Sequence, residues 1–248
     1  MDNTTYVALS LARAMQRDLD VTANNIANAN TAGFKAERIQ FSSYLFPDDG
    51  QEVGGGTNFV VDKGSFLDQT QGALTRTDNP LDIAMKGDAY FSYRTTDGQT
   101  AFGRDGQLAL DREGYLITLS GNRILDEGGG DITVPPGAGK IMISPDGTVA
   151  SDETGVLGRI GMFDVPDIQS YLRLGNSMLV PPAGRESLAR PAQGSEILQG
   201  SIELSNVSSV MEVTRLMTIQ KAYDQAVKLM TTEDDLRKDF LRRLSQFG

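Results

Sequence analysis

Glycine and proline are confined to the middle of this chain. Residues 1–32 and residues 201–247 contain neither of them, whereas all 9 prolines and all 27 glycines except Gly248 fall between Gly33 and Gly200. These two residue types interrupt helices more strongly than any others. Their distribution therefore predicts a helix at each end of the chain and a non-helical region between the two.

The N-terminal segment carries a narrow apolar stripe of the kind that faces a partner helix. Its side chains recur at alternating spacings of three and four residues: Leu9, Ala12, Gln16, Leu19, Ala23 and Ile26. An asparagine-rich stretch follows, and the run ends at Gly33. Because asparagine and glycine favour helix C-termini, we predict that this helix ends shortly after Ile26.

The C-terminal segment keeps the same rhythm over a longer distance. Its stripe consists of Leu216, Ile219, Tyr223, Ala226 and Met230, and it resumes at Phe240 and Leu244. Ser205 or Asn206 is a candidate N-cap, and Ser209 with Glu212 has the spacing of a capping box. We predict a continuous helix to Gln246, which at roughly 1.5 Å per residue gives a length of about 60 Å.

The middle of the chain changes to a period of two, which is typical of strands. Short alternating runs occupy residues 91–95, 115–119, 141–143 and 162–165. Residue pairs that accept the positive φ of tight hairpin turns lie between them, at Asp97-Gly98, Asp105-Gly106, Glu113-Gly114 and Pro145-Asp146-Gly147. We predict a small antiparallel β domain over residues 76–184.

The predicted fold class is therefore α+β. Residues 1–35 and 205–248 form a terminal helical domain, with the two helices paired as a coiled-coil-like stem. Residues 36–75 and 185–204 form an extended connector region, because the glycine run 54–56 and a polar stretch favour extended or loosely structured chain. The helical stripes are expected to be buried against each other or against neighbouring molecules.

The composition excludes several classes of protein. Hydrophobic residues make up 39% of the chain and charged residues 23%, which is ordinary globular usage. The sequence has neither a run of 18 apolar residues nor the basic start and apolar stretch of a cleaved secretory signal. A formal net charge of -10 disfavours nucleic acid as a partner. The basic group near the C-terminus is interpreted as a complement to the helix dipole rather than a docking patch: Arg237, Lys238, Arg242 and Arg243.

The residue types that carry most enzyme chemistry are missing. Histidine and cysteine are both absent, which removes the commonest general base and metal ligand as well as all thiol chemistry. No nucleophile elbow, Ser-x-x-Lys motif or calcium loop occurs in the sequence. We predict that the chain is not an enzyme, with no catalytic, cofactor-binding or metal-ligating residue and no small-molecule substrate.

Two alternatives from other classes stay open. One is a carbohydrate-binding or carbohydrate-acting protein whose β domain uses a carboxylate pair such as Asp105 and Asp111. The other is an export chaperone or adaptor that uses the helical hairpin alone, although the full β domain disfavours it.

Four stretches of the chain match one known family in the same order. Residues 23–35 read ANNIANANTAGFK, which resembles the N-terminal signature of the flagellar rod and hook protein family. Residues 79–91 resemble the entry to that family's β domain, although Ala89 stands where glycine is usual. Residues 102–111 resemble a hairpin of the family, and residues 200–207 resemble the start of its C-terminal helix. The resemblance covers nearly the whole chain.

The resemblance implies a structural subunit of the bacterial flagellar basal-body rod. It implies export by the flagellar type III system without a cleaved signal peptide, and assembly in the periplasm. The implied partners are further copies of the chain, the proximal-rod proteins, the distal-rod protein FlgG, and the inner-membrane ring and export gate. The two helices are then expected to be largely disordered before assembly.

Within the family, the chain length and the opening Met1-Asp2 with Tyr6 favour a proximal-rod subunit, with FlgG as the alternative. The helical stripes and the family motif together predict an assembly interface. Its expected residues are Leu9, Leu19, Asn24, Asn25, Ile26, Asn28, Gly33, Phe34, Asn206, Val207, Leu216, Ile219, Tyr223 and Met230.

Overall fold

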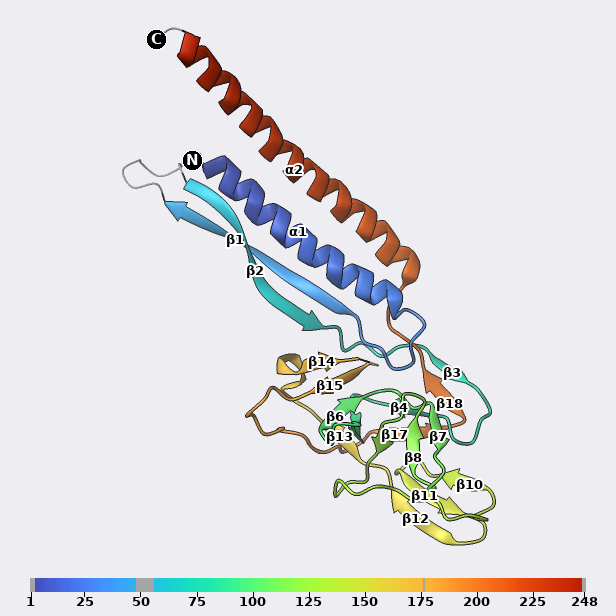
Figure 1. The fold of residues 1–248 in the computed structure, drawn as a ribbon. Helices are drawn as coiled ribbons and strands as arrows, with labels where there is room; N and C mark the ends of the chain where they lie inside the picture. The colour runs from blue at the N-terminus through green and yellow to red at the C-terminus, as the bar shows by residue number, and fades with distance from the viewer. Residues whose placement is uncertain (1–2, 48–55, 176, 247–248) are drawn as a thin grey trace. The chain divides into compact units, whose positions relative to one another are not determined.

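A computed structural model describes residues 3–47, 56–175 and 177–246 (Figure 1). The chain divides into two compact units. The first, which we call the helical unit, comprises Met1–Ala27, Glu37–Phe66 and Ser208–Gly248. The second, the β unit, comprises Asn28–Ala36 and Leu67–Val207. Each unit is built from segments that are distant in the sequence, so the chain passes between them several times.

The helical unit contains both terminal helices. Helix α1 spans Asn3–Ala27 and helix α2 spans Ser209–Gln246. They lie alongside each other in opposite directions (Figure 1), since Thr5 near the start of α1 bonds to Glu233 and Asp18 farther along bonds to Arg215. The two predicted helices are confirmed, and α1 ends one residue after Ile26. Their packing as a coiled coil stays a prediction.

The buried face of α1 matches the predicted stripe only in part. Ala12 is buried as predicted, whereas Leu9, Gln16 and Ala23 are exposed. Thr22, which lies outside the stripe, is buried. The physical reason is that α1 contacts strand β1 as well as α2. The helix therefore buries two faces, and a single apolar stripe cannot identify both. On α2 the first part of the predicted stripe faces inward, since Ile219 and Ala226 are buried and Leu216, Tyr223 and Met230 are half-buried. Phe240, where the stripe was predicted to resume, is 63% exposed, so that part of the prediction is wrong. The side chain of Leu244 lies outside the described residues.

The start of α2 corrects the predicted caps. The backbone N–H of Glu212 donates to the carbonyl of Ser208, which is therefore the first residue of the helix's hydrogen-bond ladder. Asn206 does not cap the helix, because its side chain bonds to Ala36, Asp68 and Thr70. Ser205 accepts the N–H of Val207, ahead of the helix. The capping box from Ser209 to Glu212 is also wrong, since the Glu212 carboxylate pairs with Arg38 at 2.6 Å.

Two long strands complete the helical unit. Strand β1 (Glu37–Pro47) and strand β2 (Gly56–Leu67) form a two-stranded sheet. The sequence predicted extended chain here but no pairing, because the apolar alternation is broken at Ser42-Ser43. Of the glycine run 54–56, the first two residues lie outside the part of the chain that the structure describes.

The β unit is made of short strands and one 3-10 turn, η1 (Ile168–Ser170). Its strands are β3 (Leu74–Arg76), β4 (Ile83–Lys86), β5 (Tyr90–Arg94), β6 (Thr100–Gly103), β7 (Leu108–Leu110), β8 (Leu116–Thr118), β9 (Arg123–Ile124), β10 (Ile141–Ile143), β11 (Thr148–Ser151), β12 (Gly155–Arg159), β13 (Met162–Asp164), β14 (Leu172–Leu174), β15 (Met178–Val180), β16 (Arg190–Pro191), β17 (Glu196–Gln199) and β18 (Ser201–Glu203).

These strands pair in an antiparallel manner, as predicted. The largest sheet has the order β14-β15-β6-β5-β9-β8-β7, with β13 also beside β5 and β16 beside β13. Strands β10, β11 and β12 form a separate sheet, and the pairs β17-β4 and β18-β3 form two more. Residues 185–204, expected as connector, thus supply three strands: β16 pairs with β13, β17 with β4 and β18 with β3.

The turn predictions hold at three places and fail at one. Gly98, Gly114 and Gly147 adopt φ values of 79°, 86° and 89°, as tight turns require. Gly106 is needed for a different reason, since a Cβ atom there would lie 1.8 Å from the carbonyl oxygen of Ile83. Strands β6 and β7, on either side of Asp105-Gly106, are not paired with each other. The expected hairpin at Asp105-Gly106 is therefore wrong.

The main core of the β unit lies between its sheets. It includes Ile83, Met85, Phe91, Tyr93, Leu116 and Ile124, all fully buried. A second cluster gathers Tyr90, Phe102, Ile168 and Tyr171. Within the main core, the hydroxyl of Tyr93 donates to the carbonyl of Asp105 at 2.6 Å. That bond lets a tyrosine be buried without an unsatisfied polar group.

Replacing Tyr93 by phenylalanine tests this arrangement. The Tyr93→Phe variant is expected to unfold with a free energy lower by about 1–2 kcal/mol, because the buried carbonyl of Asp105 loses its donor. Urea unfolding followed by circular dichroism measures the change. The partly exposed Tyr115 is the control, and Tyr115→Phe is expected to change stability by about 0.5 kcal/mol or less. Equal stability of Tyr93→Phe and wild type contradicts the account.

Candidate assembly interface

The predicted interface residues fall into two groups. Those on the helices belong to the helical unit, and those of the family motif after α1 and before α2 belong to the β unit. The helical group comprises Leu9, Leu19, Asn24, Asn25, Ile26, Leu216, Ile219, Tyr223 and Met230, and the motif group comprises Asn28, Gly33, Phe34, Asn206 and Val207. The two groups have different surroundings, so they have different roles.

Asn25 is an internal clamp of the helical unit. Its side-chain N–H donates to the carbonyl of Glu37 at 2.9 Å, and its side-chain oxygen accepts the N–H of the same residue at 3.0 Å. The side chain is 1% exposed. It therefore satisfies both backbone groups of the first residue of β1 and fixes that strand to the end of α1. Asn24, its neighbour, is exposed.

Two ion pairs, each between a buried carboxylate and a half-buried arginine, join α1, α2 and β1 of the helical unit. Asp18 of α1 pairs with Arg215 of α2 at 2.9 Å, and Arg38 of β1 pairs with Glu212 of α2 at 2.6 Å. Burial raises the pKa of Asp18, and the charge of Arg215 opposes that rise. Because Asp18 and Glu212 are 6% and 1% exposed, a shifted register leaves buried charges unpaired.

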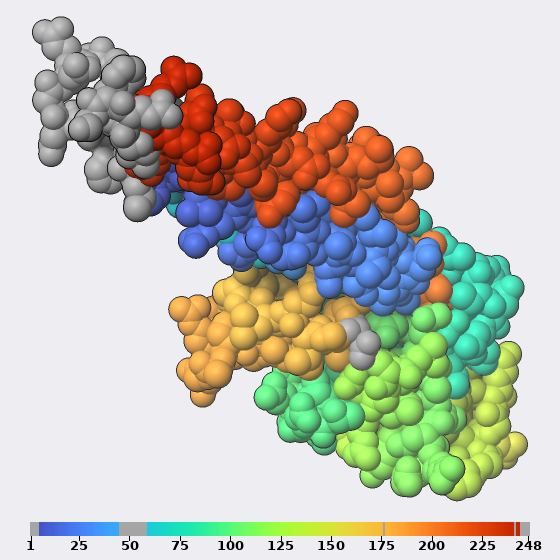
Figure 2. Space-filling view, turned by 45° about the horizontal axis from the view of Figure 1, so that its top comes forward, coloured from blue at the N-terminus to red at the C-terminus, as the bar shows by residue number. Residues whose placement is uncertain are grey.

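The outward side of α2 carries large apolar side chains. Val210, Met211 and Met217 near its start are 78%, 68% and 64% exposed. Leu236 and Phe240 near its end are 67% and 63% exposed. Figure 2 shows α2, coloured orange to red, as an open ridge along α1. Large apolar side chains in such numbers on one helix indicate a surface that another protein covers.

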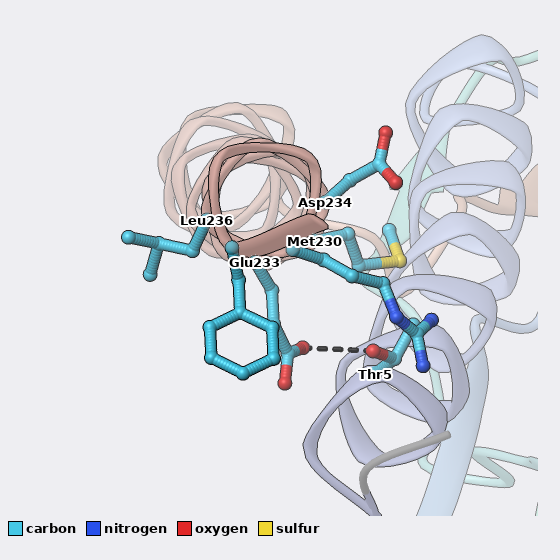
Figure 3. A pocket seen from close by; sticks show the side chains of 7 residues that line it. Thr5, Met230, Glu233, Asp234 and Leu236 are labelled. Carbon is cyan, nitrogen blue, oxygen red and sulfur yellow. Dashed lines mark hydrogen bonds between the residues drawn. The ribbon is translucent and has the colours of Figure 1, made fainter. Parts of the chain in front are cut away.

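The last turns of α2 form one side of a pocket (Figure 3). Its lining consists of Thr5, Met230, Glu233, Asp234, Leu236, Arg237 and Phe240. Glu233 accepts a hydrogen bond from the hydroxyl of Thr5 at 2.8 Å, which closes one end of the pocket. The pocket therefore combines two exposed apolar side chains with charged groups on its rim, as protein interfaces do.

Within the β unit, the motif residues Gly33, Phe34 and Val207 are buried, and Asn28 and Asn206 are half-buried. Phe34 is 1% exposed and lies beneath the guanidinium of Arg173, 4.4 Å from the ring centre. Val207 and Ala36 pack with Phe34 in a small cluster of their own. Gly33 has a φ of 65°, and a Cβ there would lie 2.3 Å from the carbonyl carbon of Arg104. These contacts are internal, which separates the motif residues from the exposed face of α2.

Three charged residues at this place were not among the expected site residues. Glu203 is fully buried and bonds to Lys35 at 2.6 Å and to Arg104 at 3.2 Å. All three stand in the stretches that carry the family resemblance. What the sequence did not reveal is that these stretches meet, since Lys35 and Glu203 are 168 positions apart.

The carboxylates of the carbohydrate alternative are both engaged in turns. Asp111 accepts the N–H groups of Glu113 and Tyr115 at 3.0 and 2.7 Å. Asp105 accepts the N–H of Gln107 at 3.1 Å. Burial raises the pKa of Asp105 to about 6, with a smaller contribution from the charge of Asp82. The raised pKa of Asp105 is therefore explained by its burial in a turn, and it does not indicate a catalytic role.

Among the described residues, no group of three acidic, histidine or cysteine side chains is placed to hold a metal ion. Neither α1 nor α2, as far as they are described, is long and apolar enough to cross a membrane.

The raised pKa of Asp105 makes the stability of the β unit depend on pH. Between pH 3.8 and about 6 the unfolded chain has lost the Asp105 proton while the folded chain still holds it. Stability therefore falls as the pH rises through this window, by up to about 3 kcal/mol, and the loss persists above it. Asp105→Asn removes this loss and keeps an oxygen for the Gln107 N–H.

We expect Asp105→Asn to unfold at higher urea than wild type at pH 7.5, and at nearly the same urea concentration at pH 4.0. Asp111→Asn is the matched control, because it changes a turn aspartate of the same unit. A destabilised Asp105→Asn variant at pH 7.5 contradicts the burial account and favours a structural need for the charge.

Three flagellar families match separate parts of the chain. The family "Flagella basal body rod protein" matches residues 6–35, which include α1 and the following motif. The family "Flagellar hook protein FlgE/F/G D1 domain" matches residues 84–151 of the β unit. The family "Flagellar basal body rod FlgEFG protein C-terminal" matches residues 198–243, which include β18 and most of α2.

Relatives of similar length match the chain from end to end. The flagellar basal-body rod protein FlgF of Caulobacter vibrioides is 35% identical over 249 residues, covering 100% of both chains. FlgF of Rhizobium meliloti is 36% identical, covering 93% of this chain and 92% of its own. FlgG of Caulobacter vibrioides is 32% identical, covering 92% of this chain and 94% of its own. The chain therefore belongs to the flagellar basal-body rod protein family, whose members are structural proteins of the flagellum and not enzymes.

Proposed function

We propose that the chain is an FlgF-type subunit of the proximal rod, which polymerises through its terminal helices into the tubular drive shaft. The shaft transmits torque and passes exported subunits. The observation that carries this proposal is the end of α2, where Leu236 and Phe240 are 67% and 63% exposed. The identities of 35% and 36% to FlgF, against 32% to FlgG, favour the proximal over the distal rod.

The two helices differ in length. Helix α2 has 38 residues and α1 has 25, a difference of about 20 Å at roughly 1.5 Å per residue. Thr5 lies beside Glu233, so the antiparallel direction of α1 brings its start level with that part of α2. Leu236 and Phe240 follow Glu233 on α2 and line the same pocket as Thr5 of α1. Both side chains nevertheless remain more than 60% exposed.

Burial of such side chains in an assembly is favourable. Transfer of one leucine or phenylalanine from water to an apolar contact stabilises by about 1.5–3 kcal/mol. The subunit alone leaves Met217, Leu236 and Phe240 more than 60% exposed. Repeated head-to-tail contacts through the same two surfaces do not close into a ring, and they generate a helical tube. The helical unit thus suits a polymer better than a monomer.

The partners in this proposal are other rod subunits: further copies of this chain, other proximal-rod proteins and the distal-rod protein FlgG. The inner-membrane ring and the export gate are the neighbours at the base. The subunit reaches the periplasm through the flagellar type III system. Its helices are expected to be largely disordered until neighbours cover them, because few of their apolar side chains are buried within one chain.

The alternative within the family is a distal-rod FlgG-type subunit, since FlgG proteins also match over most of the chain. The alternative of a carbohydrate-acting β domain is set aside, because the relatives are rod proteins. Labelling the subunit in purified basal bodies separates the two rod positions. Label at the base favours the proximal assignment, and label next to the hook favours the distal one.

Charge on the end of α2 tests the polymerisation surface. The double variant Leu236→Asp/Phe240→Asp is expected to leave the β unit folded and to abolish swimming, because the two carboxylates oppose burial of the helix against a neighbour. Motility in soft agar and detection of the subunit in purified basal bodies measure the effect.

Thr231→Asp is the control, because Thr231 is an exposed residue of the same helix. Its substitution adds a carboxylate to α2 away from Leu236 and Phe240. It is expected to swim normally. Normal swimming and normal basal-body content of the double variant contradict the proposed surface.

Removal of either helix tests the division of labour between the units. A chain lacking residues 1–27 or residues 208–248 is expected to keep the circular dichroism and cooperative unfolding of the β unit, while it no longer enters basal bodies. The deletion stops at residue 27 because Asn28–Ala36 belongs to the β unit. Complete basal bodies built from either shortened chain rule out a central role for the helices.

A further inference from the structure

The chain crosses between the two units at four points, after Ala27, Ala36, Phe66 and Val207. We propose that Glu203, with Lys35 and Arg104, forms an electrostatic clasp that gathers these crossings on the β unit and that opens as a local unit, separately from the β core. Every contact of the clasp lies within the β unit. The proposal therefore does not depend on the assembly proposed above.

Glu203 is the centre of the clasp. One oxygen of its carboxylate accepts the Nζ of Lys35 at 2.6 Å and the N–H of Gly72 at 2.9 Å. The other oxygen accepts Nη1 of Arg104 at 3.2 Å. The Lys35 ammonium also donates to the carbonyl of Thr70 at 2.7 Å. A single side chain thereby joins four segments of the chain.

The segments that carry Lys35, Arg104 and Glu203 also contact one another through their backbones. The N–H of Gly33 donates to the carbonyl of Glu203 at 2.8 Å. A side chain at position 33 would overlap the backbone of Arg104, since its Cβ would lie 2.3 Å from the carbonyl carbon. The clasp therefore requires glycine at this place as well as the three charges. Gly33 and Lys35, which both belong to the motif of residues 23–35, are thus both part of the clasp.

The crossings themselves are joined by hydrogen bonds. The N–H of Ala36 donates to the side-chain oxygen of Asn206 at 2.7 Å, and the N–H of Asp68 donates to the carbonyl of Ala36 at 2.8 Å. The side-chain N–H of Asn206 donates to the carbonyl of Asp68 at 2.9 Å. Residues next to three of the four crossings are therefore tied to one another. The fourth leads through a turn, Thr31 to Asn28, directly into Gly33.

The clasp has its own small apolar cluster. Phe34, Ala36 and Val207 pack together, apart from the main core of the β unit. Strands β3 and β18 pair only with each other in their sheet, and neither belongs to the large sheet. A region with a separate cluster and a separate sheet is a candidate for local opening while the rest of the unit stays folded.

The buried charges of the clasp favour one arrangement of these segments but add little to its stability. Lys35, Arg104 and Glu203 are 4%, 2% and 0% exposed, so each has left water. Burial lowers the pKa of Lys35, and the Glu203 carboxylate opposes that change. Buried ion pairs add little net stability, but removal of one partner leaves a charge without compensation. The clasp is thus closed when Glu203 is paired with both Lys35 and Arg104.

The large separation of the clasp residues in the sequence determines when the clasp can form during folding. Lys35 and Glu203 are separated by 168 positions. The clasp therefore closes only after nearly the whole chain up to residue 203 is available, whichever end folds first.

Hydrogen exchange of the full-length protein carrying Glu203→Gln tests the clasp. We expect exchange at least about tenfold faster than wild type in peptides covering residues 28–36, 67–72 and 200–207, with no change over β10 to β12. Glu196→Gln is the matched control, because Glu196 of the same unit forms an exposed pair with Lys86 at 2.9 Å. It is expected to exchange like wild type in all of these peptides.

Two results overturn the proposal. Unchanged exchange in the three clasp peptides shows that Glu203 does not hold them. Equal acceleration over β10 to β12 shows that Glu203 is part of the general core and that no separate local unit exists. If Glu203→Gln does not fold, Asn206→Ala replaces it, because Asn206 joins the crossings without a buried charge. Faster exchange confined to the clasp peptides supports the proposal, and exchange like wild type there overturns it.

Discussion

Burial of the Glu203 carboxylate imposes a condition that the rest of the β unit has to meet. A carboxylate with no exposed surface needs cations and N–H donors around it, and Lys35, Arg104 and Gly72 supply them. These residues come from distant parts of the sequence. Satisfying one side chain therefore brings the segments before β1 and before α2 together, and it places the points where the chain enters and leaves the helical unit next to one another.

The two units use their side chains differently. The β unit buries a continuous core, with Ile83, Met85 and Phe91 fully inaccessible to water. The helical unit buries mainly alanines and a few polar pairs, such as Asp18 with Arg215, and leaves its largest apolar side chains exposed. A unit of this second kind gains most of its stability from neighbours. In the proposed function, the β unit therefore supplies a stable fold and the helical unit supplies the surface for assembly.

The sequence predicted the helices and the antiparallel β region because both depend on local patterns. Absence of glycine and proline located α1 and α2, and a period of two with positive-φ glycines such as Gly98 and Gly147 located strands and turns. The pairing of β1 with β2 was missed because Ser42-Ser43 breaks the alternation. Such pairing is decided by contact with α1, which no local pattern records.

The candidate interface was predicted less completely. The stripe of α2 was located correctly from Leu216 to Met230 but not at Phe240, which is exposed. The buried face of α1 was predicted only in part, because α1 packs against two elements. Motif residues such as Phe34 were expected at a surface and lie inside the β unit. Leu236 and Phe240 are exposed near the end of α2, where the sequence predicted only that the apolar stripe continues at Phe240. Motifs identify which residues matter to a family, whereas the partners of those residues come from contacts between distant positions.

A cryo-electron microscopy map of purified basal bodies, with this subunit located in it, tests the account most directly. The account predicts that the last turns of α2, with Leu236 and Phe240, are buried against helices of neighbouring subunits, while each β unit keeps its clasp closed. A map in which this part of α2 faces open solvent, and the subunits touch through their β units alone, contradicts it.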